Sequence, residues 1–150
     1  MKTLRDEQCR AALIERLGRL TPNAKAAWGR MNVEQMLSHL VQTGELPFEA
    51  TAPDRSGFMS SKVIKPLVLY VLPMPKEVKT GPEVDQQQNG RPPVGFDEDR
   101  TSVVDGINRI GTLPLEHKCL AHPFFGPMNA KQWATLAHKH IDHHLRQFGV

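Results

Sequence analysis

Residues 129–150 constrain the fold of this chain more than any other stretch, because they combine a helix start, a helix stop and one continuous apolar face. Asn129 is a favourable N-cap, Gln132 completes a capping box three residues later, and Gly149 ends the helix. We therefore predict a helix over residues 129–148. Residues spaced by one helical turn form its inward stripe: Trp133, Ala137, His140, Ile141, His144 and Phe148.

Two histidines lie on this predicted inward stripe. His140 and His144 are four residues apart, which brings their Cβ atoms to about 5–6 Å on one helix face. One metal ion can bridge a pair at this spacing. His138 and His143 fall off the stripe, and we expect both to be partly exposed or to lie behind the metal ligands and support them. A surface cluster, or core histidines satisfied by hydrogen bonds, remain alternatives to a metal site.

Three further stretches have the apolar spacing of amphipathic helices. They cover residues 4–20, 32–43 and 96–111. The second begins with the same kind of capping box as the last helix, formed by Asn32 and Gln35. A shorter apolar run ends at residue 72, and Pro66 near its start favours a short helix over residues 66–72.

These elements predict an all-α fold, a four-helix bundle that forms a single domain over residues 1–150. The long connection over residues 44–95 would act as a crossover between helices two and three. Its second part, residues 73–95, is rich in proline, glycine and glutamine and has no periodicity. Connections of this length are uncommon inside compact domains and are often functional or mobile.

The composition is typical of a globular cytoplasmic protein. Hydrophobic residues make up 39% and charged residues 23%, and the net charge of +3 is spread over the chain, so we expect neither nucleic acid nor a membrane as a partner. The most apolar run, Val63 to Leu72, is broken by Lys65 and Pro66 and is too short to span a bilayer. The first residues lack the apolar core of a signal peptide. Cys9 and Cys119 form no CxxC motif, which favours a reducing compartment.

His39 is the other histidine on a predicted core face of a long helix. Imidazole nitrogens bind zinc and related metals at about 2.0–2.1 Å, and catalytic sites combine three protein ligands with an open position. His39, His140 and His144 therefore form the predicted ligand set. A metal held by them can activate water or hold a thiolate.

Two polar residues outside this set bear on the same hypothesis. His122 lies in the loop before the last helix and precedes the sequence Pro-Phe-Phe, which we expect to pack over the end of the bundle. A role for His122 as an additional ligand or acid/base group is the alternative. Gln147 lies one turn beyond His143 and can hydrogen-bond a metal ligand, as metal sites require, although an exposed glutamine fits the pattern equally.

Two segments resemble the DinB-like (YfiT-like) superfamily. They are Trp28-Gly-Arg-Met-Asn-Val-Glu-Gln-Met-Leu-Ser-His39 and His140-Ile-Asp-His-His-Leu-Arg-Gln147. Members of that superfamily typically have a histidine in the second helix and an H-x-x-H-H-x-x-Q signature in the last. The similarity covers most of the chain in helix order. The additional sequence His122-Pro-Phe-Phe-Gly resembles an uncharacterised branch.

The resemblance implies an up-down-down-up four-helix bundle with a divalent metal, most often nickel or zinc, held by three histidines. On the matching positions these are His39, His140 and His144. Characterised relatives include thiol-dependent S-transferases, a thiol-dependent isomerase and metal-dependent hydrolases. Relatives are often homodimers, and the apolar residues of segment 58–72 can supply such an interface.

The expected function is therefore that of a metal-dependent transferase, using a thiol, or of a hydrolase, acting on an unidentified small molecule. The alternative is a non-catalytic metal- or ligand-binding bundle with a structural metal, whose fourth position is closed by a residue such as His122 or Glu45. A bundle without a metal, with ordinary core and surface histidines, is the third possibility.

Overall fold

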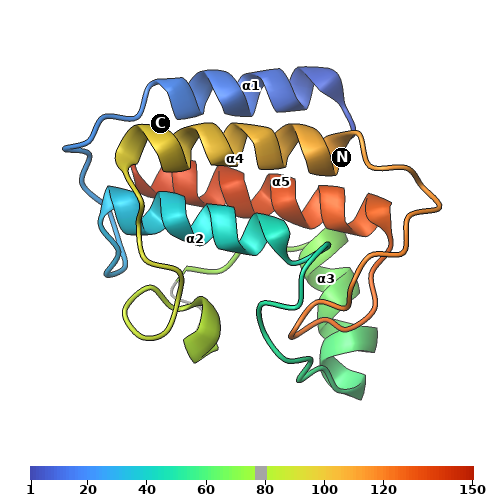
Figure 1. Ribbon diagram of the computed structural model, residues 1–150. Helices are drawn as coiled ribbons and strands as arrows, with labels where there is room; N and C mark the ends of the chain where they lie inside the picture. Colours follow the sequence, from blue (N-terminus) through green and yellow to red (C-terminus); the bar gives the residue numbers. More distant parts are fainter. Residues whose placement is uncertain (77–80) are drawn as a thin grey trace.

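The computed structural model describes residues 1–76 and 81–150, and the regular structure of these residues is helical apart from one isolated β-bridge (Figure 1). The helices are α1 (Glu7–Gly18), α2 (Val33–Glu45), α3 (Lys65–Tyr70), α4 (Phe96–Gly111) and α5 (Ala130–Gln147). A π-helical turn (Met59–Ile64) leads into α3, and a 3-10 turn (Pro82–Val84) precedes α4. The predicted all-α class is confirmed.

The helices α1, α2, α4 and α5 lie side by side, and α3 lies at one end of this group (Figure 1). The colours of Figure 1 show that α1 and α5 run in one direction and that α2 and α4 run in the opposite one. α5 contacts all four other α-helices. The helix with the strongest sequence signal is therefore the element on which the others pack.

The two histidine-bearing helices begin as predicted. The side chains of Asn32 and Asn129 accept hydrogen bonds from the backbone N–H groups of Gln35 and Gln132 at 2.8 and 3.0 Å, and both glutamine side chains bond back to the caps. α2 differs from the prediction at its end, because it continues past Gly44. A glycine inside a helix costs about 1 kcal/mol relative to alanine, which the packing of α2 on α4 offsets.

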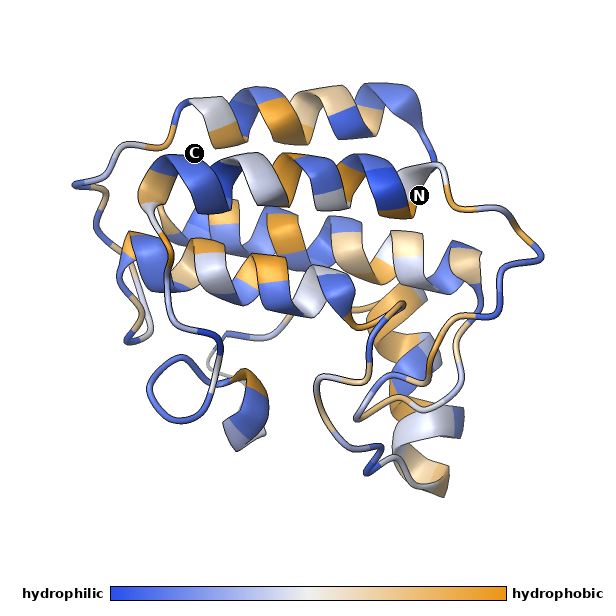
Figure 2. Ribbon diagram, viewed as in Figure 1, coloured by the Kyte–Doolittle hydropathy of each residue, from blue (hydrophilic) through white to orange (hydrophobic). Residues whose placement is uncertain are grey.

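Buried apolar side chains form two clusters. The bundle cluster joins α1, α2, α4 and α5 through residues such as Leu13, Leu17, Met36, Leu37, Val103, Ile107, Ile110, Ile141 and Leu145. The end cluster joins α3 and the loop before α5 to the N-terminal half of α5, and it consists of Leu46, Val68, Leu69, Phe125, Met128, Trp133 and Leu136. Figure 2 shows apolar residues alternating with polar ones along the long helices and concentrated on α3. Among the described residues, no helix combines the length and apolarity that a membrane crossing requires.

The connection from α2 to α4 is fixed at its far end by an ion pair between half-buried Arg91 and fully buried Asp99. Asp99 is 0% exposed and accepts hydrogen bonds from Arg91 Nη1 at 2.8 Å and from the Val94 N–H at 3.0 Å. Ser38 Oγ donates to the Arg91 carbonyl at 2.7 Å, and Arg91 Nη1 lies 3.0 Å from the same hydroxyl. Because Ser38 precedes His39, this ion pair holds the connection against α2 beside the histidine.

Candidate metal centre

The structure brings His39, His140 and His144 together between α2 and α5. His140 Nε2 lies 3.2 Å from His39 Nε2 and 3.1 Å from His144 Nε2, and ligand atoms of the three residues lie within 4.8 Å of one another. The rings meet edge to face, with centroids 4.7–5.1 Å apart. Three imidazole nitrogens from two helices thus face one point.

The spacing of the nitrogens fits a shared metal ion. With metal–nitrogen bonds of about 2.0–2.1 Å, neighbouring ligands lie about 3.3 Å apart in a tetrahedral site and about 3.0 Å apart in an octahedral one. The observed separations of 3.1 and 3.2 Å fall between these values. The donor set therefore fits a divalent ion, whose identity the geometry leaves open.

A chain of hydrogen bonds fixes the orientation of His39. The Gln42 amide nitrogen donates to the Glu83 carbonyl at 2.7 Å, so its Oε1 must accept, from the Gln86 amide at 2.9 Å and the Arg91 N–H at 3.0 Å. Gln86 is thereby turned so that its Oε1 lies 3.0 Å from His39 Nδ1. The Val84 carbonyl also lies 3.0 Å from this Nδ1.

Since a carbonyl oxygen only accepts, His39 Nδ1 carries the proton, and its Nε2 presents a lone pair to the centre.

His144 is oriented in the same sense by Gln147. The Gln147 amide nitrogen donates to the Trp28 carbonyl at 2.6 Å, so its Oε1, 2.7 Å from His144 Nδ1, accepts the ring proton. Gly29 makes this approach possible: its φ is +80°, and a Cβ there would lie 2.7 Å from the Gln147 amide nitrogen. His144 Nε2 therefore also presents a lone pair, and the predicted role of Gln147 as a partner of a candidate ligand is confirmed.

His140 is the most exposed of the three histidines. It is half-buried, whereas His39 and His144 are 4% and 6% exposed. No hydrogen bond within the described residues involves its Nδ1, so its ring can carry the proton on Nδ1 and direct its Nε2 lone pair to the centre.

Burial lowers the pKa of all three histidines, and that of His144 falls to about 3; the charges of the neighbouring imidazoles lower the pKa of His140 further. Neutral rings are the form that a metal requires.

A family model matches residues 2–149, nearly the whole chain, and its description is "Protein of unknown function (DUF1569)". The chain belongs to this family. No curated protein and no solved structure matches it. The family assignment carries no activity, so the chemistry of this DUF1569 chain rests on the geometry described above.

Of the two alternatives for His138 and His143, partial exposure is wrong for both. They are 5% and 8% exposed in this DUF1569 chain. The physical reason is that other segments cover these faces of α5. Lys139 Nζ donates to the carbonyls of Val68 and Leu72 at 2.5 and 2.6 Å, which holds α3 and the residues after it beside His138. The ring of Trp28 lies against His143. The periodicity of α5 alone could not reveal this cover.

His143 has a place beside the cluster. Its ring lies edge-on to those of Trp28 and His144, with centroids 5.6 and 5.1 Å away. Its ring therefore supports the walls of the centre.

Two residues named as possible fourth ligands do not join the three histidines. Glu45 accepts a hydrogen bond from Arg109 at 2.8 Å. His122 uses its Nδ1 to accept from the backbone of its own loop. The predicted packing of the Pro-Phe-Phe sequence after His122 is confirmed in part, because Phe125 is buried in the end cluster while Phe124 is 49% exposed.

Sequence reasoning missed the residues that orient His39. Gln42 lies on α2 among half-buried residues, and Gln86 belongs to a run of glutamines in a connection without periodicity. Both contribute through contacts across 44 or more positions of sequence. Only Gln42 has a sequence signal: it is a polar residue three positions after His39 and continues the histidine face of α2.

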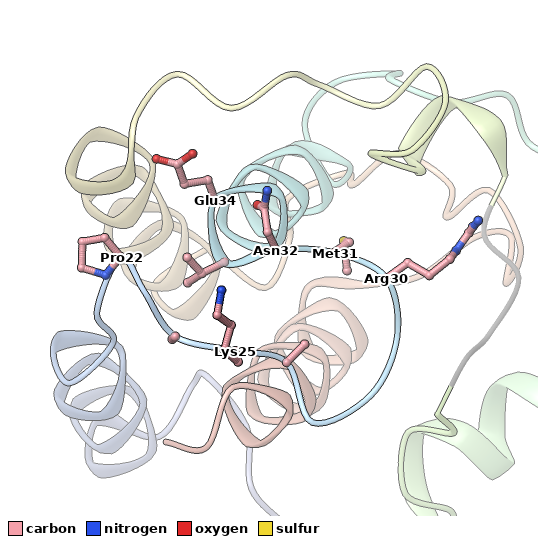
Figure 3. Close-up of a pocket in the computed structure, with 9 residues that line it drawn as sticks. Pro22, Lys25, Arg30, Met31, Asn32 and Glu34 are labelled. Atoms are coloured by element: carbon pink, nitrogen blue, oxygen red, sulfur yellow. The ribbon is translucent and has the colours of Figure 1, made fainter.

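The chain of this DUF1569 protein has a surface hollow away from the cluster. It has a volume of about 310 Å³, lies at the N-terminal end of α2 and is lined by residues such as Pro22, Lys25, Arg30, Asn32 and Glu34 (Figure 3). None of the three histidines lines it.

Proposed function

We propose that this chain is a divalent-metal protein with His39, His140 and His144 as ligands, and that it is a metal-dependent enzyme, a thiol-dependent transferase or a hydrolase. The observation that carries the proposal is the convergence of three Nε2 atoms, two of them on rings whose tautomer is set by carbonyl acceptors. Water-bonded surface histidines need no such restraint.

Three ligands leave room for a reacting group. Within residues 1–76 and 81–150, no fourth histidine, cysteine, aspartate or glutamate joins the cluster. Structural zinc sites are closed by four protein ligands, whereas catalytic sites keep a position open. A divalent ion in this site would polarise an oxygen or lower the pKa of a thiol or water. The protein supplies neutral, pre-oriented imidazoles and a half-buried approach at His140.

The proposal includes nickel or zinc as the ion and the DinB-like superfamily as the wider relationship. The histidine of the second long helix, the H-x-x-H-H-x-x-Q sequence of α5 and the directions of the four long helices support that relationship and a four-helix-bundle assignment. A divalent ion bound by imidazole suits both metals, and the substrate class rests on the superfamily alone.

The experiment compares nickel- or zinc-loaded protein with chelated protein in two assays: consumption of cysteine or 2-mercaptoethanol by a bromobimane electrophile, and hydrolysis of p-nitrophenyl acetate. We expect metal-dependent turnover in one assay, lost in His144→Ala and kept in a His117→Ala control. His117 lies in a loop, outside the cluster.

Equal rates with and without metal in both assays would contradict the enzyme proposal. If the loaded protein is inactive but loses much of its thermal stability when a chelator is added, the result supports the alternative of a structural metal.

A further inference from the structure

His122 is held by its own loop more tightly than an ordinary loop residue. Its backbone forms an isolated β-bridge with Gly126, with N···O distances of 2.9 and 2.8 Å. Its Nδ1 accepts hydrogen bonds from the Phe124 and Phe125 N–H groups at 3.0 and 3.2 Å. Gly126 has a φ of +69°, and a Cβ there would lie 2.7 Å from Ser56 Oγ. Backbone and ring of His122 are therefore fixed together.

This arrangement decides which ring nitrogen carries the proton. A nitrogen that accepts from two N–H groups holds a lone pair, so the proton of neutral His122 is on Nε2. Burial lowers the pKa of His122 to about 4, so the ring is neutral at pH 7. No hydrogen bond among the described residues uses Nε2. The loop thus presents a fixed, neutral donor with no protein acceptor.

The ring of His122 packs against the end cluster. Its centroid lies 5.3 Å from that of Trp133 and 4.8 Å from that of Phe125, both members of the end cluster. Trp133 precedes His140 on α5 by about two helical turns, or about 10 Å. Leu46, also in the end cluster, follows His39 by the same interval.

Since α2 and α5 run in opposite directions, both intervals extend to the same end of the molecule (Figure 1).

A second polar group in this region also has no partner. The Thr51 hydroxyl is buried and makes no hydrogen bond within the described part of the chain. Thr51 precedes Ala52, which packs against the end cluster. Binding sites for small molecules are mostly apolar, with a few polar groups that fix orientation. The end cluster with His122 and Thr51 has this composition.

We propose that His122 is a substrate-contacting residue, which donates a hydrogen bond from Nε2 to a carboxylate or carbonyl oxygen at the far end of a substrate that reacts at the three histidines. This inference rests on the proposed function, because it takes the three-histidine centre as the reacting end. It selects elongated substrates with an acceptor at the far end over compact ones.

The experiment uses mercaptocarboxylates of increasing length, which vary the distance between the thiol and the carboxylate. Zinc-loaded protein is titrated calorimetrically with mercaptoacetate, 3-mercaptopropionate and 6-mercaptohexanoate, in wild type and in His122→Asn. Asparagine Oδ1 can still accept from the loop N–H groups, while the donor at the Nε2 position is lost. We expect 6-mercaptohexanoate to lose about tenfold in affinity in the variant and mercaptoacetate to lose none, since one hydrogen bond to a charged group is removed.

Two further variants sharpen the test. His122→Gln keeps a donor near the Nε2 position and should retain part of the advantage of the long ligand. His117→Asn changes a histidine of the same loop that takes no part in the end cluster and should bind like wild type.

Three results would overturn the inference. An equal loss of affinity for long and short ligands in His122→Asn, or no loss for either, would show that His122 makes no contact with the far end of the ligand. Neither result would contradict the proposed function. If no thiol binds the zinc-loaded wild type, the thiol-dependent form of the proposed function fails and the inference fails with it.

Discussion

His144 and His39 face the same point but are held there by different parts of the molecule. The partner of His144 is Gln147, three residues along the same helix, and only the Trp28 carbonyl behind Gln147 comes from elsewhere. The partners of His39 are Val84 and Gln86, which belong to the connection between α2 and α4.

The local restraint therefore persists as long as α5 is helical, whereas the remote restraint depends on how the connection docks. This difference predicts that substitutions in the connection mainly lower the free energy of unfolding and disturb the orientation of His39. Substitutions on α5 should mainly lower the affinity for the metal.

The largest effect should follow from Arg91→Met, which removes the cation beside fully buried Asp99. An unpaired buried carboxylate costs about 3–5 kcal/mol, so the free energy of unfolding in urea should fall by that amount. Arg100→Met is the matched control, because its partner Asp97 is 81% exposed and such pairs contribute about 0–1 kcal/mol. Similar losses in the two variants would contradict a remote restraint fixed by the pair of Arg91 and Asp99.

A smaller effect should follow from Gln147→Leu, which cuts the local restraint. Loss of a hydrogen bond to a metal ligand typically costs about 10–100-fold in metal affinity. We expect a loss in this range for zinc, measured by competition with a chromophoric chelator, with α5 intact by circular dichroism. An unchanged affinity would show that His144 needs no partner to present its Nε2.

Gln86→Leu should weaken zinc binding less than Gln147→Leu, by less than about tenfold. His39 Nδ1 keeps the Val84 carbonyl as an acceptor after this change. Gln87→Leu, at the neighbouring exposed position, is the control. If Gln86→Leu lowers the zinc affinity more than Gln147→Leu does, the restraint on His39 matters more than the restraint on His144, opposite to our expectation.

The same contrast explains how much could be predicted from the sequence. Capping boxes, apolar periodicity and the spacing of His140, His144 and Gln147 are local patterns; they predicted α2, α4 and α5, and they offered Gln147 as a partner of a ligand beside the alternative of an exposed side chain. The convergence of His39 followed from its place on a core face.

The remaining features depend on contacts between distant segments. The packing of α3 and Trp28 on α5 buries His138 and His143, for which partial exposure was one of two expectations. The docking of the connection selects Gln86 from a run of similar glutamines. Neither contact has a periodic signal, because loops dock through single hydrogen bonds rather than repeated faces.

A pH-dependent effect concerns His122, whose restraint is also local. Its pKa is about 4 in the folded chain against an ordinary 6.5, so the unfolded chain takes up a proton first as the pH falls below 6.5. Stability contributed at neutral pH is therefore lost between pH 6.5 and about 4. In metal-free protein, His122→Asn should lose less stability over this range, by at most about 3 kcal/mol. Parallel stability profiles for variant and wild type would contradict this assignment.

The central claim is that three histidines bind one metal ion, and elemental analysis of untagged protein after reconstitution with nickel or zinc and desalting tests it most directly. We predict about one ion per chain in the wild type, and a loss of stoichiometric binding in His39→Ala, His140→Ala and His144→Ala variants that remain helical. A wild type that holds less than about a few tenths of an ion per chain, or an unchanged metal content in the three variants, would contradict the metal centre.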